Sequence, residues 1–538
     1  MYSLSFSRLR GIVNTLTLSL TALCAAAPAV VAAQGTPVRG GTLIAVVQPE
    51  PQVLTSAINT GNPTGVVSVN IFDGLLSYDE KLAPQPALAQ SWQISQDGKS
   101  ITFHLRHGVK WHDGAPFTSA DVRFSALEIW KKVHPRGRVT FAELRDVETP
   151  DAYTAVFRLD HPSPAIMSAL NAMEGQILPE HIYGGTDIAK TALSKPPIGT
   201  GPFRFKEWKK GQYIELERNP DYWDSGKPYI DKLIFRIIPD AATRSAAFET
   251  GDVQYGAYSI VPLSDVARLT KLPTIGIQTH GYEWGAPFLT LEFNLRHAPL
   301  NQLKVRQAIA QAVDKRGLID TVWYGFGKPA TGPVPSPLKN FYTADVQHYD
   351  YNVAQAEKLL DAAGYPRKAD GVRFNLSIDY MAYGDVYRDS AEYLRQNLKR
   401  VGINVTVHNQ DLSTYVRRVY SNYDFDLNLV QMSAFMDPQM GIHRLLSTRG
   451  ISQGIPWTNA SGFSNAEMDR VIEASQTDND PARRTEEFHQ LQRISQQNLP
   501  LLPLIELQHF TLYNRRLHGL SSAPDASEAS LKDVWLSR

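Results

Sequence analysis

The chain has 538 residues, with 54 basic side chains, 54 acidic side chains and one cysteine, Cys24. This balance, without any basic run, argues against nucleic acid as a partner. The length suits roughly two to four domains, and a single cysteine excludes an intramolecular disulfide or a cysteine metal site. The apolar core alone must therefore hold the fold together.

The first 33 residues have the layout of a secretory signal. Their only charged residues are Arg8 and Arg10, and an uncharged run follows as far as Val31. Small residues at 31–33 predict cleavage near Ala33, which would remove Cys24 and release the chain into the periplasm. The mature chain would then carry 52 basic and 54 acidic side chains.

The alternatives to cleavage are that the leader stays as a membrane anchor or carries a lipid anchor. The uncharged run approaches the ~20 residues that a membrane span requires, although Asn14 and Pro28 make it a poor span. A lipoprotein signal needs a small residue before its cysteine, but Leu23 precedes Cys24. We therefore prefer cleavage near Ala33 to an uncleaved anchor or a lipid anchor.

The first half of the mature chain begins with strand patterns. The run 41–47 is apolar and β-rich, and it predicts a buried strand. Ile101, Phe103 and Leu105 alternate with polar residues, which predicts a half-buried strand. Thr118 with Asp121 then resembles a capping box at the start of a helix.

The second half of the chain alternates helix and strand patterns. Apolar residues recur at helical spacing in 305–323, and 387–401 reads as a helix followed by a strand at 403–407. Start signals at Asn352, Ser464 with Glu467, and Asp480-Pro481 predict three more helices. This alternation predicts α/β domains with largely parallel sheets.

Five separated segments carry a resemblance to a known family. The segments, in chain order, are Phe72-Asp73-Gly74-Leu75-Leu76 with 88–92 and 97–99, the run 103–114 with 117–122, 199–203 with 219–223, Phe293-Asn294-Leu295 with 305–309, and 354–364 with the stretch through Asp437-Pro438. Their order and spacing are similar to bacterial extracellular solute-binding proteins of family 5, the receptors for oligopeptides, dipeptides and nickel complexes.

This resemblance implies a class II periplasmic-binding-protein fold, of the α/β class, with two discontinuous lobes and an extra inserted domain. One lobe would comprise residues 34–77, 196–281 and 498–538, the insert 78–195, and the other lobe 282–497. Hinges near 195–200 and 280–285 would let the lobes close over a ligand in the cleft between them.

The charged anchors of peptide-binding relatives are missing at the matching positions. Ala434 stands where those relatives have an aspartate for the ligand's terminal ammonium, and Met381 stands in place of the arginine that binds the carboxylate. Leu412 replaces a stacking tryptophan, whereas Tyr383 matches a pocket tyrosine. These differences favour a less charged or larger ligand, or anchors shifted to Asp379, Asp385 or Asp437.

Candidate ligand-binding residues lie near the expected junction of the lobes. They are mostly aromatic, with methionine and a few polar groups, a composition that suits an adaptable pocket; the set is Tyr282, Trp284, Tyr380, Tyr383, Met432, Ala434, Phe435, Asp437 and Trp457. The alternative interpretation is that each aromatic residue simply belongs to the core.

The expected function is the periplasmic substrate-binding component of an ABC importer. It would capture a peptide or other small solute and deliver it to an inner-membrane permease, as a monomer without cofactor or metal. His104, His107 and His112 lack a matching carboxylate for a metal site. No nucleotide loop, nucleophile elbow or zinc helix occurs, so we expect no enzyme. The alternatives are a scavenging or sensing receptor for haem, a metal chelate or an oligosaccharide, and a periplasmic glycosidase.

Overall fold

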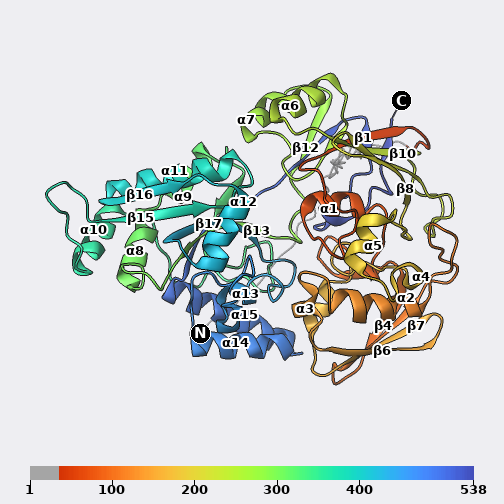
Figure 1. Ribbon diagram of the computed structural model, residues 1–538, viewed down its shortest axis with the longest axis horizontal. Coiled ribbons are helices and arrows are strands. Elements are labelled where there is room, and N and C mark those ends of the chain that lie inside the picture. The colour runs from red at the N-terminus through yellow and green to blue at the C-terminus, as the bar shows by residue number, and fades with distance from the viewer. Residues whose placement is uncertain (1–35, 538) are drawn as a thin grey trace, which may run out of the picture. The chain divides into compact units, whose positions relative to one another are not determined.

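The computed structural model describes residues 36–537, whose strands form two large sheets and one smaller sheet (Figure 1). The predicted leader, residues 1–33, lies outside the described residues. In the part of the chain that is described, no helix combines the length and apolar composition that a membrane crossing needs.

A seven-stranded sheet forms the framework of the first lobe. Its strands, in spatial order, are β12 (Ile275–Gln278), β19 (Thr511–Asn514), β11 (Tyr255–Gly256), β1 (Thr42–Val47), β10 (Lys232–Ile237), β9 (Tyr213–Arg218) and β8 (Phe203–Lys209). β1 is the buried strand predicted from the apolar run, and it pairs in parallel with β10.

A six-stranded sheet forms the framework of the second lobe. Its strands, in spatial order, are β14 (Gly327–Pro329), β18 (Leu501–Leu507), β13 (Pro287–Phe293), β17 (Leu427–Ser433), β15 (Phe374–Tyr380) and β16 (Ile403–His408). Every residue of β13 and β18 is buried, because both strands lie inside the sheet with helices around them.

A four-stranded antiparallel sheet follows the first strand in sequence and is drawn in orange tones in Figure 1. Its order is β4 (Ala89–Ile94), β5 (Ser100–Leu105), β7 (Thr154–Leu159) and β6 (Leu144–Asp151). Ile101, Phe103 and Leu105 are buried while His104 is exposed, as the alternation predicted. Two short pairs complete the strands: β2 (Leu76–Tyr78) with β3 (Pro84–Pro86), and β20 (Leu517–His518) with β21 (Trp535–Leu536).

Several helices begin at side chains that satisfy free backbone N–H groups. Thr118 and Asp121 form the predicted capping box, while Asn352 and Asp480 cap their helices as predicted. The α-helices are α1 (Asn62–Ser68), α2 (Ser119–Phe124), α3 (Gly137–Thr140), α4 (Glu180–Tyr183), α5 (Ile188–Ser194), α6 (Ala241–Thr250), α7 (Leu263–Leu269), α8 (Leu303–Ala312), α9 (Lys315–Thr321), α10 (Val353–Ala362), α11 (Asp385–Arg400), α12 (Leu412–Val416), α13 (His443–Leu446), α14 (Ala466–Thr477) and α15 (Pro481–Asn498).

Five short helices of other types complete the secondary structure. Two are π-helical, η1 (Ser125–Trp130) and η3 (Arg417–Asn422), and each continues directly from an α-helix. Three are 3₁₀-helical: η2 (Pro164–Ser168), η4 (Thr448–Gly450) and η5 (Ala526–Glu528).

Three expectations about the elements are wrong. The pattern in 305–323 forms two helices, because Asp314 interrupts it and accepts a hydrogen bond from Gly317 N at the start of α9. The cap of α14 is Asn465, one residue after the predicted Ser464. The sheets are mixed, with parallel pairs only at β1 and β15 among the described strands, because short hairpins such as β8–β9–β10 force antiparallel pairing.

Two segments cross between the large sheets. Residues 279–286 connect β12 to β13, and residues 508–510 connect β18 to β19. Because β18 pairs with β13, the expected boundary at residue 498 lies too early, and the chain returns to the first lobe only at β19. The expected hinge at 280–285 lies within the first crossing, whereas 195–200 leads into β8 and joins no two large sheets.

Candidate ligand-binding site

The two crossing segments are tied together by Tyr282. Its hydroxyl lies 2.6 Å from Thr511 Oγ1 and accepts a hydrogen bond from Tyr258 N at 2.9 Å. The rings of Tyr258 and His509 pack around it, with centroids 5.2 and 5.7 Å from that of Tyr282. Burial lowers the pKa of His509 to about 4, so this histidine is neutral at neutral pH. Tyr282 therefore belongs to the first crossing, and whether it contacts a ligand stays a prediction.

Trp284 and Phe435 bring the second lobe against the first. The Trp284 ring is fully buried and meets the Phe435 ring edge-on, with centroids 5.4 Å apart. Phe435 follows β17 and adopts a left-handed backbone, φ 62°, which non-glycine residues rarely do. The Arg136 guanidinium lies 4.6 Å from the centroid of the same ring. A continuous contact thus runs from the first crossing through the second lobe to Arg136.

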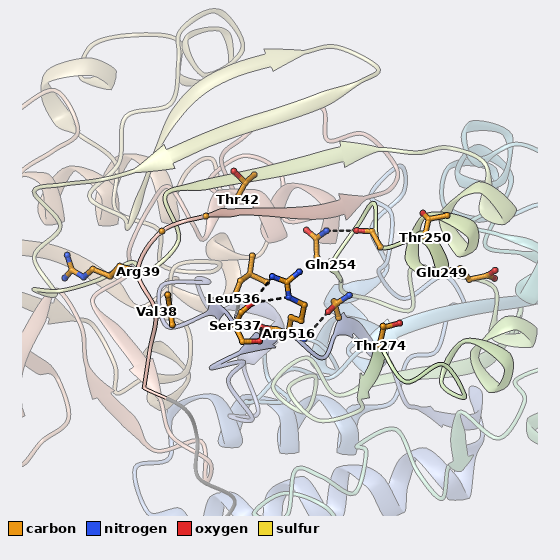
Figure 2. Close-up of a pocket in the computed structure, with 14 residues that line it drawn as sticks. Val38, Arg39, Thr42, Glu249, Thr250, Gln254, Thr274, Arg516, Leu536 and Ser537 are labelled. Carbon is orange, nitrogen blue, oxygen red and sulfur yellow. Dashed lines mark hydrogen bonds between the residues drawn. The ribbon is translucent and has the colours of Figure 1, made fainter.

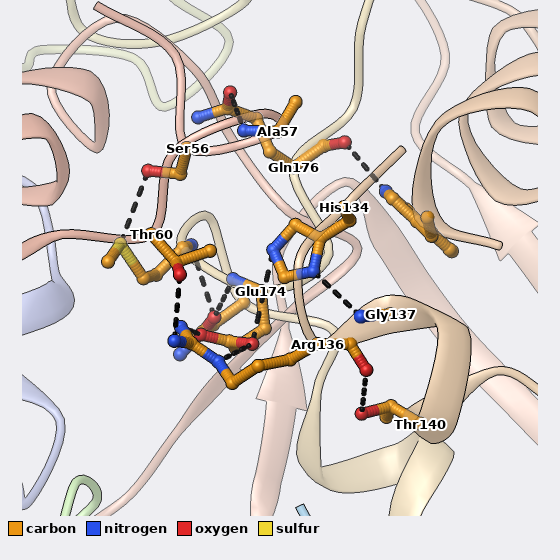
Figure 3. A network of polar contacts seen from close by, with 12 residues as sticks. Ser56, Ala57, Thr60, His134, Arg136, Gly137, Thr140, Glu174 and Gln176 are labelled. Atoms are coloured by element: carbon orange, nitrogen blue, oxygen red, sulfur yellow. Dashed lines mark hydrogen bonds and ion pairs between the residues drawn. The ribbon is translucent and has the colours of Figure 1, made fainter. Parts of the chain in front are cut away.

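Arg136 is held in a buried ion pair with Glu174 (Figure 3). Arg136 Nε donates to Glu174 Oε2 at 2.9 Å, its Nη2 contacts Oε1, and its Nη1 donates to Thr60 Oγ1 at 2.8 Å. Burial alone would raise the pKa of Glu174, but the charge and hydrogen bonds of Arg136 outweigh it, and the pKa lies below its ordinary value. Glu174 is therefore ionised, with Arg136 on both of its oxygens and His134 Nε2 4.0 Å from Oε2.

Two further charged side chains face this pair from opposite lobes. Arg444 lies on α13 of the second lobe, and burial lowers its pKa to about 10, with the charge of Arg136 lowering it further. Glu528 lies on η5 of the first lobe, and burial followed by the charge of Glu174 raises its pKa well above the ordinary value. We name Arg136, Glu174, Trp284, Phe435, Arg444 and Glu528 the interlobe cluster.

Several buried polar atoms around this cluster have no hydrogen-bond partner within residues 36–537. They are Asn171 Nδ2, His134 Nε2, Trp284 Nε1, Tyr420 Oη and Glu528 Oε2. Leaving a buried polar group unpaired costs about 1–3 kcal/mol, so each such atom in a native structure calls for an explanation. A ligand that supplies the missing partners is one such explanation.

An aromatic group in the second lobe adjoins the cluster. We define it as Tyr383, Tyr415, Tyr420 and Trp457; the Trp457 centroid lies 6.2, 6.1 and 5.5 Å from those of the three tyrosines in that order. Tyr383 is 59% exposed, whereas Tyr415 and Tyr420 are fully buried. Tyr420 connects the aromatic group to the interlobe cluster, because its phenol and the Arg444 guanidinium each influence the pKa of the other.

The remaining predicted site residues are buried near the ends of strands. Tyr380 ends β15 and donates to Asn409 Oδ1 at 2.7 Å, Met432 lies in β17 opposite Phe288, and Ala434 is fully buried with its N–H bonded to Ala286 O. Whether a ligand touches them stays a prediction.

The three acidic residues considered as shifted anchors already have partners. Both Asp437 oxygens lie 2.8 Å from Arg484 nitrogens in a buried pair. Asp379 Oδ1 accepts from Arg418 Nε at 2.9 Å, and the exposed Asp385 pairs with Arg388 at 3.0 Å. Asp437 therefore has a partner within the protein, and whether a ligand also contacts it stays a prediction.

Arg136, Glu174, Arg444 and Glu528 are the residues that reasoning from sequence missed. One signal was present for two of them, since Glu174 is the only charged residue in the run 165–178 and Arg444 is the only Asp, Glu, Lys or Arg in the run 438–448. A lone charge in an apolar run needs a partner or a ligand. Nothing in the sequence indicated which distant segments would supply that partner.

A separate surface pocket of about 680 Å³ lies beside the start of β1 (Figure 2). Its charged wall residues already have partners, since Arg516 donates to Ser537 O at 2.8 Å, Glu249 pairs with Arg268, and Arg39 donates to Gly226 O. None of the predicted ligand residues lines it. Within residues 36–537, no group of three His, Cys, Asp or Glu side chains is placed to hold a metal ion.

Comparison with known proteins decides the family. Residues 83–453 match the family described as bacterial extracellular solute-binding proteins, family 5 Middle. The chain belongs to this family. As a family 5 protein it has the two-lobed fold that the resemblance implied, here built on the seven- and six-stranded sheets.

Relatives cover nearly the whole of this family 5 protein. It is 28% identical to the oligopeptide-binding protein AppA of Bacillus subtilis over 94% of this chain and 93% of AppA. It is 30% identical to a putative ABC transporter peptide-binding protein of Brucella ovis over 80% of this chain and 81% of that protein.

Solved structures agree with this assignment. Bacillus subtilis AppA in complex with a nonapeptide has a TM-score of 0.79 at 27% identity and covers 94% of this chain and 100% of AppA. NikZ from Campylobacter jejuni in complex with Ni(L-His) has a TM-score of 0.77 at 25% identity, covering 89% of this chain and 95% of NikZ. The fold is therefore the same in relatives whose ligands differ.

Proposed function

We propose that this protein is the substrate-binding component of an ABC importer and captures a peptide or peptide-like solute between its two lobes. The main support for this proposal is the set of unpaired polar atoms and aromatic rings found where the lobes meet. Relatives named for peptide binding extend over both lobes, which supports a peptide as the ligand class.

The place of action follows from the same proposal. The protein would work in the periplasm after cleavage near Ala33, as a monomer that hands its ligand to a permease in the inner membrane. Ligand binding with lobe closure is its whole activity, and no chemical step is assigned to it. Hinge closure at residues 279–286 and 508–510 would produce the shape that the permease recognises.

Thermal unfolding with a library of short peptides tests this function. A ligand present at 100 times its Kd stabilises the native state by about 2.7 kcal/mol, so a bound peptide should raise Tm measurably. Oligosaccharides and metal chelates serve as the competing ligand classes. A shift with these classes and none with any peptide would contradict the proposal.

A matched pair of variants extends the same test to the site. Tyr383→Ala removes the exposed ring of the aromatic group and should weaken peptide binding by about 1 kcal/mol or more, with little change in stability. Tyr351→Ala removes a ring that is also exposed, 42%, beside Arg400 and away from the aromatic group. Equal peptide affinity for both variants would place the ligand elsewhere.

A further inference from the structure

Arg444 is a half-buried cation for which the structure shows no anionic partner within residues 36–537. Its only side-chain hydrogen bond within residues 36–537 runs from Nε to Gly441 O at a long 3.3 Å, and no ion pair joins it to Asp or Glu there. Two buried arginines differ. Arg306 donates to three backbone carbonyls and Arg484 pairs with Asp437.

The charges around Arg444 leave an excess of positive charge. Glu174 is the acid whose charge acts on the pKa of Arg444, but both of its carboxylate oxygens already contact Arg136. Burial and the charge of Glu174 raise the pKa of Glu528 well above its ordinary value, which disfavours the charged form of this carboxyl. Of the two guanidinium groups in the cluster, Arg136 has Glu174 as its carboxylate partner and Arg444 has none, and withdrawing an unpaired ion from water is costly unless a partner arrives.

The neighbouring unpaired atoms are mostly donors. His134 Nδ1 accepts from Gly137 N, so the neutral ring carries its proton on Nε2, which faces Glu174 Oε2 at 4.0 Å, beyond hydrogen-bond distance. Asn171 Oδ1 accepts from Glu174 N, which leaves its amide Nδ2 unpaired. Trp284 Nε1 can only donate, and the Tyr420 hydroxyl can donate as well. A ligand that satisfies this set must bring acceptors.

We infer that Arg444 binds a carboxylate of the solute, with Tyr420 and Trp284 as further donors around the interlobe cluster. A guanidinium matches a carboxylate through two parallel hydrogen bonds, so Arg suits this task better than Lys. The inference rests on the proposed function, since it places the ligand between the lobes. The carboxylate is either the C-terminus of a peptide or an acidic side chain.

Isothermal titration with three synthetic peptides tests the subsite. Pentaalanine offers a terminal carboxylate, its C-terminal amide offers none, and the amide with a central glutamate offers a side-chain carboxylate. Wild-type protein should prefer one of the two acids over the plain amide. In Arg444→Met this preference should fall by roughly 30-fold or more, and Arg444→Lys should retain part of it.

Two controls separate binding from folding. Arg449→Met removes an arginine of the same segment whose side chain is 86% exposed and pairs with Glu473, and it should leave all three affinities unchanged. Ligand-free Arg444→Met should unfold at the same or a higher temperature than wild type, because the variant no longer holds an unpaired charge at this half-buried position. A lower Tm would mean that Arg444 stabilises the fold and would count against the subsite.

The outcomes distinguish a failure of the carboxylate subsite at Arg444 from a failure of the proposed peptide-binding function. Equal binding of acids and amide by wild type and Arg444→Met would overturn the subsite while leaving the peptide receptor intact. Failure of every peptide to bind wild type would overturn the proposed function. In that case the solute that co-purifies with the protein tests the subsite. A solute with a carboxylate would support binding at Arg444, and an uncharged or cationic solute would refute it.

Discussion

At the scale of single residues, buried charges and the partners they find dominate the site. Asp437 and Arg484 are 2% and 5% exposed, and together they tie the loop after β17 to α15. Arg484 Nε also donates to Ser475 O at 2.7 Å. Breaking such a pair leaves one charge buried and unpaired, whereas an exposed pair is screened by water.

Asp437→Ala should therefore destabilise the protein by about 3–5 kcal/mol, measured by chemical denaturation. Asp385→Ala is the matched control, because its pair with Arg388 is exposed and should contribute under about 1 kcal/mol. Similar small losses in both variants would show that the Asp437 pair does not stabilise the fold.

Because Glu292 is a buried acid, we expect the stability of the protein to depend on pH. This residue is 1% exposed in β13, its carboxylate accepts a hydrogen bond from Asn428, and burial raises its pKa from 4.5 to about 7. The native state thus holds a proton that the unfolded state releases near pH 4.5. Its contribution is complete below that pH and is lost as the pH rises towards 7, by about 3 kcal/mol at most.

Comparing wild type with Glu292→Gln isolates this contribution. The difference in unfolding free energy between the two proteins should change between pH 4.5 and 7 in the direction that favours the variant at high pH. Glu473→Gln, an exposed glutamate on α14, should show no such change. A flat difference curve would contradict this account, because it would mean that the Glu292 carboxyl has the same pKa in the native and unfolded states.

At the scale of elements, the crossing segments determine how the lobes are joined. The Tyr282 hydroxyl links the first crossing to Thr511 in β19 and to the backbone of Tyr258. Tyr282→Phe keeps the ring but leaves these buried groups unpaired, which should cost about 1–3 kcal/mol in thermal unfolding. Tyr324→Phe, at a tyrosine 55% exposed, is the control. Equal effects would assign no role to the Tyr282 hydroxyl.

Local patterns predicted elements well where the decisive contacts lie within a few residues. Asn352 and Asp480 cap their helices because a cap depends on the next turn alone. The break at Asp314 was missed because an apolar helical pattern continues through it. The direction of strand pairing was missed because it depends on connections between segments rather than on the strands themselves.

At the scale of the whole molecule, the site is assembled from segments far apart in the chain. Tyr282, Trp284 and Phe435 could be placed near the lobe junction because the family resemblance located the crossing. Arg136, Glu174 and Glu528 could not, because they come together only when three segments that are far apart in the chain fold against one another. The sequence alone does not show which distant charged residues come into contact in the folded protein.

Native mass spectrometry of the protein purified from the periplasm is the most direct test of the central claim. A receptor with unpaired donors between its lobes should retain its natural solute during gentle purification. We predict a mixture of short peptides or peptide-like molecules that bear a carboxylate, released on denaturation. A bound sugar, haem or metal chelate as the main species would contradict a peptide receptor.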